Sequence, residues 1–543
     1  MDARRGLTRP DAESAAPLLA DDPVAGAAAN TTSAALVAGG LWSAAARVIP
    51  QLYTLVILVA AAHYLGPERL GRQSYIAFVE LSVIMLATAG MPTAVMRYVG
   101  ESLGRGRPGS VRALIRWAWA VELAAGLLGG GGIAAAALLG ADPTAAWVLA
   151  GIAAALGVFH TVPSALLIGA QRWRAASVVG LATGSLGTAA TVAVLAAGGG
   201  ITSMFAVEAA VGVANLAWTS ILARRTAIQL TTTTEPAGEL RRQTLRYALL
   251  ASVGIVLSFI VWRRSEFFFL QRYSTYTEIA LYSIPFSFVS ALVRVFEAAT
   301  AVVTPAVATL YGAGAHERIR VGYSRVLRLL VLASLPLTAA MMSLGPATLR
   351  LLGRDYRGTG TVTVIMLATF PLVPLAKAAT SLLHGLGRVR FVMIAGAVGA
   401  AANVLLDILI IPGHGAVGAA IANGGAQVMA AIPALIYSAK AAGAIEWQPR
   451  FIVRGGILSL VVGLATWGAT DVAGGGAAGI GLGLLAALGA FALTCPLLRV
   501  LPQDDAAWLQ RLTGTRLRGV PARFLRACAP RVDRPGLGGG RPA

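Results

Sequence analysis

Two stretches of this chain, ALLIGAQRWRAASVVG at residues 165–180 and SLLHGLGRVRFVMIAG at residues 381–396, align without a gap. Each consists of the end of an apolar run, a short loop with two arginines, and the start of the next run. The identical positions are Leu166/Leu382, Leu167/Leu383, Gly169/Gly385, Arg172/Arg388, Arg174/Arg390 and Gly180/Gly396. This agreement indicates an internal duplication that matches the loop after the fourth apolar run with the loop after the tenth.

The composition indicates a membrane protein. Of the 543 residues, 57% are hydrophobic and only 13% are charged, which excludes an ordinary soluble globular protein. The net charge of +20 would suggest a nucleic-acid partner in a soluble protein. Here the arginines lie mainly between apolar runs, so membrane topology explains them and no nucleic acid is expected. Cys495 and Cys528 have no Cys or His neighbour at metal spacing, so neither a metal site nor a cofactor is expected.

Fourteen apolar runs reach the length of about 20 residues that a helix needs to cross the hydrocarbon core. They predict an all-α polytopic membrane protein with about 14 transmembrane helices. A cytoplasmic N-terminus places most of the 44 lysines and arginines on the cytoplasmic side. The positive-inside rule then predicts that both termini are cytoplasmic. The opposite side holds only Arg69, Arg72, Arg272, Arg350, Arg354 and Arg357.

The runs and the duplication together predict two pseudo-symmetric six-helix lobes plus two C-terminal helices. Parallel repeats of this kind are typical of transporters in which the substrate site lies between two lobes that rock against each other. The expected parts are a disordered cytoplasmic N-terminal tail (1–34), an N-lobe (35–223), a cytoplasmic linker (224–246), a C-lobe (247–438), helices 13 and 14 (439–498), and an Arg-rich cytoplasmic tail (499–543).

The last of these parts interleaves arginines with Trp508, Leu512, Leu517 and Phe524. Basic residues mixed with large apolar ones are typical of segments that lie on an anionic membrane surface. We therefore expect the C-terminal tail to lie on the inner leaflet. Binding of a partner protein is the alternative.

Several apolar runs contain ionisable residues, as in FIVWRRSEFFFLQRY at 259–273. Such a side chain costs about 2.5–3.5 kcal/mol within the membrane, so each should face a cavity or a partner. The candidates are Arg47 in helix 1, Glu80 in helix 2, Arg263, Arg264 and Glu266 in helix 7, and Arg294 and Glu297 in helix 8. Further candidates are Glu122, Glu208, Lys377 and Asp407, although Lys377 can also snorkel to the membrane boundary.

Helices 7 and 8 each place an arginine and a glutamate three residues apart, on one helical face. A structural ion pair is therefore the alternative to a substrate site. If the arginines converge between the lobes, they form a cationic cavity that suits a phosphate-containing headgroup, because guanidinium binds phosphate oxygens in bidentate fashion. On this interpretation the substrate-binding residues are Arg47, Arg263, Arg264 and Arg294. The coupling or charge-balancing residues are Glu80, Glu266 and Glu297.

Four segments carry a resemblance to a known family. They are AAHYLGPERLGRQSYIAF (61–78), RRSEFFFLQRYSTYTEIALYSIPFSF (263–288), LLGRDYRGTGTVTVIM (351–366) and IIPGHGAVGAAIAN (410–423). In order and spacing they resemble the polysaccharide transporter branch of the multidrug/oligosaccharidyl-lipid/polysaccharide (MOP) exporter superfamily. The resemblance implies a flippase that moves a polyprenyl-diphosphate-linked oligosaccharide across the bacterial inner membrane by alternating access. It also implies membrane lipids and the glycosyltransferases and polymerase of polysaccharide assembly as partners.

Three other functions remain to be weighed. A peptidoglycan lipid-precursor flippase of the same superfamily also has fourteen helices. An ion-coupled multidrug exporter typically carries an acidic residue in helix 1, whereas residues 35–62 contain Arg47 and no Asp or Glu. A membrane enzyme would need a large external loop with catalytic residues, and the expected outward loops are too short for one. We therefore expect a transporter without enzymatic activity.

Overall fold

The computed structural model describes residues 23–529 apart from 105–107, 231–237, 263–264, 301–302, 351–353, 357, 444–448, 475, 514–523 and 526. These residues are almost entirely helical and include no strand. Eleven of their helices are long and apolar enough to cross a membrane. Side chains such as those of Leu128 and Leu497, which are 79% and 81% exposed, suit a surface that faces lipid. The predicted all-α membrane fold is thereby confirmed.

Two long helices are hairpins that each contribute two spans. Helix α1 (Pro23–Thr88) contains a non-helical residue at Gly66 (φ 74°, ψ 170°), and α14 (Val389–Ala442) contains one at Gly415 (φ 51°, ψ −128°). Glycine adopts such positive φ values without steric cost. A straight helix of 54 residues would measure about 80 Å, against a hydrocarbon core of about 30 Å. The second arm of α14 instead returns along the first, since a Cβ added at Gly425 would lie 2.9 Å from the Leu406 side chain.

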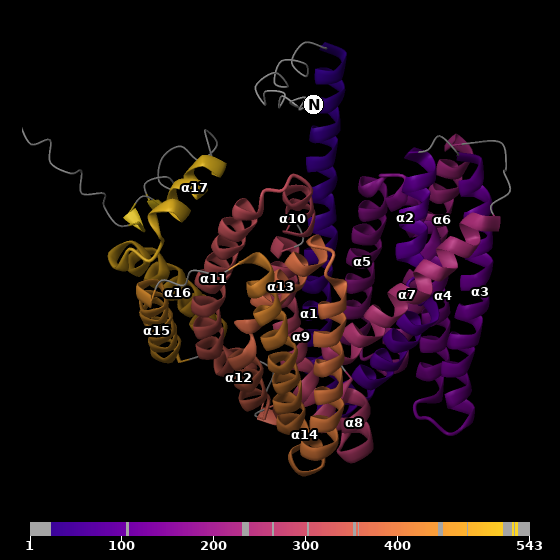
Figure 1. The fold of residues 1–543 in the computed structure, drawn as a ribbon. Coiled ribbons are helices and arrows are strands. Elements are labelled where there is room, and N and C mark those ends of the chain that lie inside the picture. The colour runs from indigo at the N-terminus through magenta and orange to yellow at the C-terminus, as the bar shows by residue number, and fades with distance from the viewer. Residues whose placement is uncertain are drawn as a thin grey trace, which may run out of the picture.

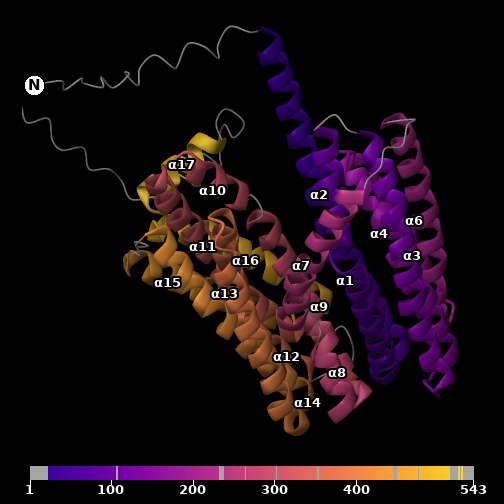
Figure 2. The same cartoon turned by 45° about the vertical axis from the view of Figure 1, so that its right-hand side comes forward.

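The helices form two neighbouring bundles (Figures 1 and 2). The first bundle contains α1, α2 (Met91–Gly104), α3 (Pro108–Leu138), α4 (Thr144–Gly169), α5 (Trp173–Ala196) and α6 (Ile201–Leu230). The second contains α8 (Glu266–Tyr273), α9 (Tyr276–Thr300), α10 (Val303–Gly312), α11 (His316–Arg350), the 3-10 turn η1 (Arg354–Tyr356), α12 (Thr359–Thr369), α13 (Leu372–Gly385) and α14. Helix α7 (Gly238–Trp262) packs against both α2 of the first bundle and α14 of the second. Helices α15 (Pro449–Val472), α16 (Gly476–Leu498) and α17 (Gln503–Thr513) follow.

The two ends of the molecule differ. The end at the top of Figure 1, where α2, α10 and α17 lie, is called the tail end below. The opposite end, where α8 and the Gly415 turn of α14 lie, is called the hairpin end. Helix α7 has 25 residues, which is long enough to cross the hydrocarbon core, so together with the two hairpins the described helices account for the predicted count of about 14 spans.

The duplicated stretches have the same local structure. Arg172 precedes α5 with φ −87° and ψ 47°, and Arg388 precedes α14 with φ −88° and ψ 46°. A Cβ added to Gly169 would lie 2.7 Å from the carbonyl oxygen of Met96. A Cβ added to Gly385 would lie 2.8 Å from the carbonyl oxygen of Thr304. Each glycine therefore permits the same close approach of a neighbouring helix, which confirms the pseudo-symmetry of the lobes.

The helices extend beyond the expected spans in two places. Helix α1 begins at Pro23, so residues 23–34, which we expected in a disordered tail, are helical. Alanine-rich sequence after a proline at the first helical position explains this difference. Helices α6 and α7 both extend into the expected linker 224–246, because α6 ends at Leu230 and α7 begins at Gly238.

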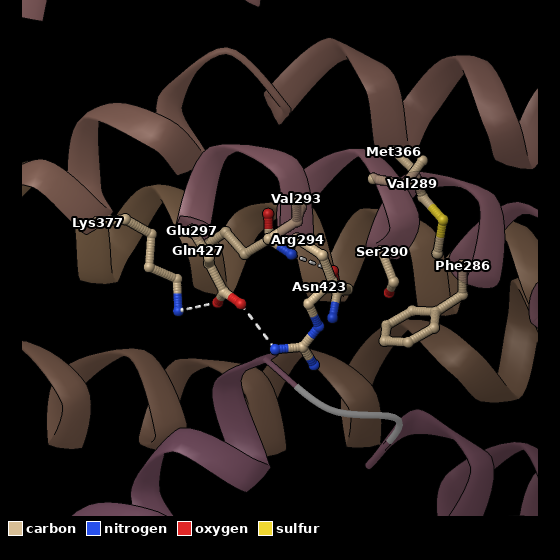
Figure 3. A pocket seen from close by; sticks show the side chains of 10 residues that line it. All are labelled: Phe286, Val289, Ser290, Val293, Arg294, Glu297, Met366, Lys377, Asn423 and Gln427. Carbon is tan, nitrogen blue, oxygen red and sulfur yellow. Dashed lines mark hydrogen bonds and ion pairs between the residues drawn. The ribbon is translucent and has the colours of Figure 1, made fainter. Parts of the chain in front are cut away.

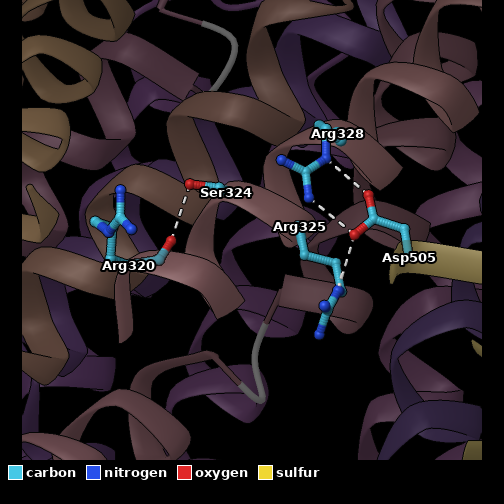
Figure 4. Close-up of polar contacts among 5 residues, drawn as sticks. All are labelled: Arg320, Ser324, Arg325, Arg328 and Asp505. Atoms are coloured by element: carbon cyan, nitrogen blue, oxygen red, sulfur yellow. Dashed lines mark hydrogen bonds and ion pairs between the residues drawn. The ribbon is translucent and has the colours of Figure 1, made fainter. Parts of the chain in front are cut away.

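The segment after α16 packs on the protein. Asp505 of α17 is fully buried and binds Arg325 at 2.9 Å and Arg328 at 2.7 Å, both on α11 (Figure 4). The Trp508 ring lies 5.1 Å from the Arg325 guanidinium, and Phe524 packs against the apolar core of the second bundle. These two aromatic residues therefore contact protein where we expected a membrane surface. The side chains of Leu512 and Leu517 lie outside the described part.

The bundles meet closely at the hairpin end. Tyr356 donates a hydrogen bond to the Ala62 carbonyl oxygen (2.9 Å), and the hydroxyls of Ser74 and Ser283 lie 3.3 Å apart. Gly71 of α1 lies so close to Tyr276 of α9 that an added Cβ would overlap with the Tyr276 carbonyl oxygen. Direct packing between the two bundles therefore closes this end.

Candidate functional site

A charged pocket lies in the second bundle between α9, α13 and α14 (Figure 3). Arg294 and Glu297 share one face of α9, as their spacing predicts, and form an ion pair of 2.6 Å. The other oxygen of Glu297 binds Lys377 Nζ of α13 at 2.9 Å. All three side chains are between 22% and 29% exposed. One carboxylate thus holds two cations from different helices.

The charged pocket has a volume of ≈ 80 Å³, and Asn423 and Gln427 of α14 also line it. Its two cations and single carboxylate leave one net positive charge. Arginine and lysine present several N–H donors in addition to those that bind a carboxylate, and phosphate oxygens accept such donors strongly. The pocket is therefore suited to an anionic group.

A polar cluster lies beside the charged pocket. Glu266, the first residue of α8, is fully buried, and its Oε1 accepts a hydrogen bond of 2.7 Å from Asn423. Asn403 and Asp407, one turn apart on the first arm of α14, are also fully buried and are joined by a hydrogen bond of 2.8 Å. Asn403 also donates to the Ser265 hydroxyl at 3.2 Å. Asn423 connects this cluster to the charged pocket, which it lines.

Three oxygen atoms of this cluster have no hydrogen-bond partner among the described residues: Glu266 Oε2, Asn403 Oδ1 and Asp407 Oδ1. Asp407 lies close enough to Glu266 to interact with its charge, and two such buried carboxyl groups cannot both stay charged unless a cation binds or a proton is shared. The cluster can therefore bind a proton or a small cation. The described residues contain no group of three or more His, Cys, Asp and Glu side chains that could hold a metal ion.

Carboxylates in the first bundle lie elsewhere. Glu80 of α1 is 5% exposed and is close enough to Glu208 of α6 to interact with its charge. Glu122 of α3 is 1% exposed, and neither of its carboxyl oxygens has a partner among the described residues. Glu80 thus does not join Glu266 and Glu297 in one group.

The structure describes some of the expected arginines only in part. Arg294 lines the charged pocket, and Arg47 lies on α1, although its side chain is outside the described part. Arg263 and Arg264 lie outside the described residues, between the ends of α7 and α8. Convergence of the four arginines on one cavity therefore stays a prediction.

Lys377, Asn403 and Asn423 are prominent in the site. Lys377 is a candidate from the sequence that can also snorkel to the membrane boundary, and in the structure it binds Glu297 and lines the charged pocket. Its signal was the rarity of lysine within apolar runs. Asn403 and Asn423 are not among the residues expected from the sequence. Asn403 lies one helical turn before Asp407, and this polar pair inside an apolar run could have indicated a buried cluster.

The arrangement of two bundles of helices defines a class of fold that is also found in solved structures of transporters. The model of the MatE family matches residues 266–409, a range that holds Glu266, Arg294, Glu297, Lys377 and Asp407. No curated protein matches the chain at a significant level.

Solved structures identify particular proteins with this fold. A structure of the lipid II flippase MurJ, in an inward closed conformation, is 12% identical, with a TM-score of 0.65 over 84% of this chain and 98% of that chain. An inward-facing multidrug resistance MATE family transporter of the MOP superfamily is 16% identical, with a TM-score of 0.63 over 74% and 98%. An outward-facing structure with the same description is 15% identical, with a TM-score of 0.53 over 74% and 96%.

Proposed function

We propose that this protein is a flippase that moves a polyprenyl-diphosphate-linked oligosaccharide across the bacterial inner membrane by alternating access. The observation that carries the proposal is the charged pocket, in which Arg294 and Lys377 share the single carboxylate of Glu297. A diphosphate brings two or more negative charges, and it can bind both cations when Glu297 gives up part of its contacts. The substrate headgroup then takes the place of an internal ion pair.

Closure of the hairpin end supports the proposed direction of access. Contacts such as that between Gly71 and Tyr276 hold the bundles together at this end. In an alternating-access cycle these contacts break while new ones form at the opposite end. The arginine distribution supports a cytoplasmic tail end, so a substrate would enter there and leave at the hairpin end.

We infer that the polar cluster couples transport to a cation, either a proton or a sodium ion. Glu266, Asn403 and Asp407 supply buried oxygens without described partners, which is what a small cation requires. Asn423 contacts Glu266 and lines the charged pocket, so occupancy of the polar cluster can change the pocket geometry. A bound cation and a bound diphosphate would thus both act on Asn423, on the second arm of α14.

The test is reconstitution in vesicles with a fluorescent polyprenyl-diphosphate oligosaccharide whose sugar is quenched from outside. Arg294→Ala and Lys377→Ala should each lower the rate of translocation by at least about tenfold, which is the effect of losing one charge-assisted contact of roughly 1.5–3 kcal/mol. Arg263→Ala should do the same if this residue also binds the diphosphate. Arg454→Ala removes a half-buried arginine of α15 that binds the Arg499 carbonyl oxygen, away from the pocket, and serves as the control. Normal translocation by both pocket variants would refute the proposal.

A second candidate is a flippase for a peptidoglycan lipid precursor. The structural similarity to the lipid II flippase MurJ, which covers 98% of the MurJ chain, favours this second function. A lipid-linked diphosphate would fit the same charged pocket. Competition in the vesicle assay separates the two candidates, because lipid II should displace the fluorescent substrate only if this second function is correct. A multidrug exporter would instead transport cationic dyes and ignore both lipids.

A further inference from the structure

A second cavity, called the apolar chamber below, lies between α7, α13 and α14 and has a volume of ≈ 670 Å³. This volume is within the range of about 300–1,000 Å³ that is typical of ligand pockets. Aliphatic side chains form most of its wall. They include Leu250 and Ile255 of α7, Val392, Met393 and Ala430 of α14, and Met85 of α1.

Small residues create this space. Gly254 of α7 lines the apolar chamber, and a Cβ added to it would meet no atom within 4 Å. Ala251 and Ala376 line it as well. Leu250 is 67% exposed and Met393 is 43% exposed, so the chamber can be entered from the surface. A chain-like apolar molecule could therefore pass between α7 and α14.

One wall of the apolar chamber is polar. Lys377, Thr380 and His384 follow one face of α13 at positions i, i+3 and i+7, and all three line the chamber. Lys377 also lines the charged pocket. The two cavities thus share this lysine, and the apolar space begins where the cationic site ends.

We propose that the apolar chamber binds the first isoprenoid units of the lipid carrier, while Lys377 and Arg294 hold the diphosphate directly beside them. The inference rests on the proposed function and adds the place where the lipid is recognised. A prenyl diphosphate has its negative charges at the end of a single apolar chain, which matches a cation at the entrance of a single apolar space. A phospholipid has two acyl chains, and its phosphate lies between glycerol and headgroup, so it fits this arrangement less well.

The test uses purified protein and a series of probes: inorganic diphosphate and the diphosphates of geraniol, farnesol and geranylgeraniol. In the wild type, each added isoprene unit should raise affinity by about tenfold or more until the chamber is filled. Gly254→Phe places a ring in the chamber and should remove this gain while leaving diphosphate binding unchanged. Gly468→Phe is the matched control, because Gly468 of α15 also has no neighbour within 4 Å of an added Cβ and lies outside the chamber. Lys377→Ala should weaken every probe, including inorganic diphosphate.

The possible outcomes separate this inference from the proposed function. If the affinity of Gly254→Phe still rises with each isoprene unit as it does in the wild type, the lipid binds elsewhere. The inference is then wrong, although the proposed flippase function stands. If the wild type binds none of the probes, the proposed function fails and the inference fails with it. If Gly254→Phe weakens phosphatidylglycerol as strongly as farnesyl diphosphate, the chamber is a general lipid site and the inference is also overturned.

Discussion

Lys377 of α13 lies 2.9 Å from Glu297 of α9, whose second oxygen lies 2.6 Å from Arg294. A single carboxylate therefore balances two cations that belong to different helices. Its removal leaves the charged pocket with two net positive charges.

Glu297→Gln should bind inorganic diphosphate about tenfold more tightly than the wild type, because the charge that competes with the ligand is gone. Translocation should become slower, since tighter binding mostly lowers the rate of release. Glu317→Gln is the matched control, because Glu317 forms the same i,i+3 pair with Arg320 on α11, away from the pocket. Binding is measured by calorimetry, and unchanged affinity in Glu297→Gln would contradict the assignment of the pocket.

Gly71→Ala should shift the protein away from the state with a closed hairpin end. The new methyl group would overlap with the Tyr276 carbonyl oxygen, so the bundles can no longer meet there. A cysteine introduced at Ser283, which contacts Ser74 across this interface, should react with a membrane-impermeant maleimide at least about tenfold faster. Gly131→Ala adds the same methyl group where no atom lies within 4 Å and should leave the rate unchanged. Equal rates in both variants would exclude this contact as a gate.

Asp407→Asn should abolish the dependence of translocation on a proton or sodium gradient while leaving binding of inorganic diphosphate intact. The asparagine keeps the shape of the side chain but removes the charge that a cation needs. The rate is measured in vesicles with and without each gradient. Glu122→Gln removes another buried carboxyl, in the first bundle, and should retain the dependence. If Glu122→Gln abolishes the dependence on the gradient and Asp407→Asn does not, the coupling residue lies in the first bundle.

Asp505→Asn should lower the free energy of unfolding by about 3 kcal/mol, because it leaves Arg325 and Arg328 without their buried partner. The Tm in detergent should fall, and protease should cut near residue 502 more readily. Asp504→Asn makes the same change at the adjacent exposed position and should have little effect. An unchanged Tm for Asp505→Asn would show that this ion pair does not hold α17.

The orientation can be tested at the two duplicated loops. Cysteines placed at Arg174 and Arg390, which are both exposed, should react only with reagents supplied from the cytoplasm. A cysteine at Glu68, near the hairpin end, should react only from the outside. The native cysteines are both buried, so their background reaction should be low. Labelling of Arg174→Cys from outside would invert the proposed topology.

Much of the fold follows from the sequence because membrane spans are constrained locally. Each span must be apolar and long enough by itself, and the repeated pair of Arg172 and Arg388 marks equivalent loops. The two hairpins were predictable as pairs of spans, but the turns at Gly66 and Gly415 are too short to resemble loops. The local sequence also could not show that α1 begins at Pro23.

The candidate site was less predictable, because it depends on which helices pack together. The pair of Arg294 and Glu297 follows from spacing on one helix. The contact of Glu297 with Lys377 joins helices that are 80 residues apart, and spacing carries no information about it. The burial of Asp505 likewise depends on α11, which lies far away in the sequence.

The contact between α17 and α11 also bears on how the protein is made. In a chain inserted from its N-terminus, Arg325 and Arg328 reach the membrane long before Asp505 is synthesised. Asp505 can reach them when α15 and α16 have both crossed, since two crossings return the chain to the tail end, whereas a single crossing leaves Asp505 on the opposite side. A chain in which one of these two helices fails to insert would keep both arginines unpaired at the membrane surface. Formation of this ion pair therefore distinguishes a correctly inserted molecule from one that quality-control proteases should remove.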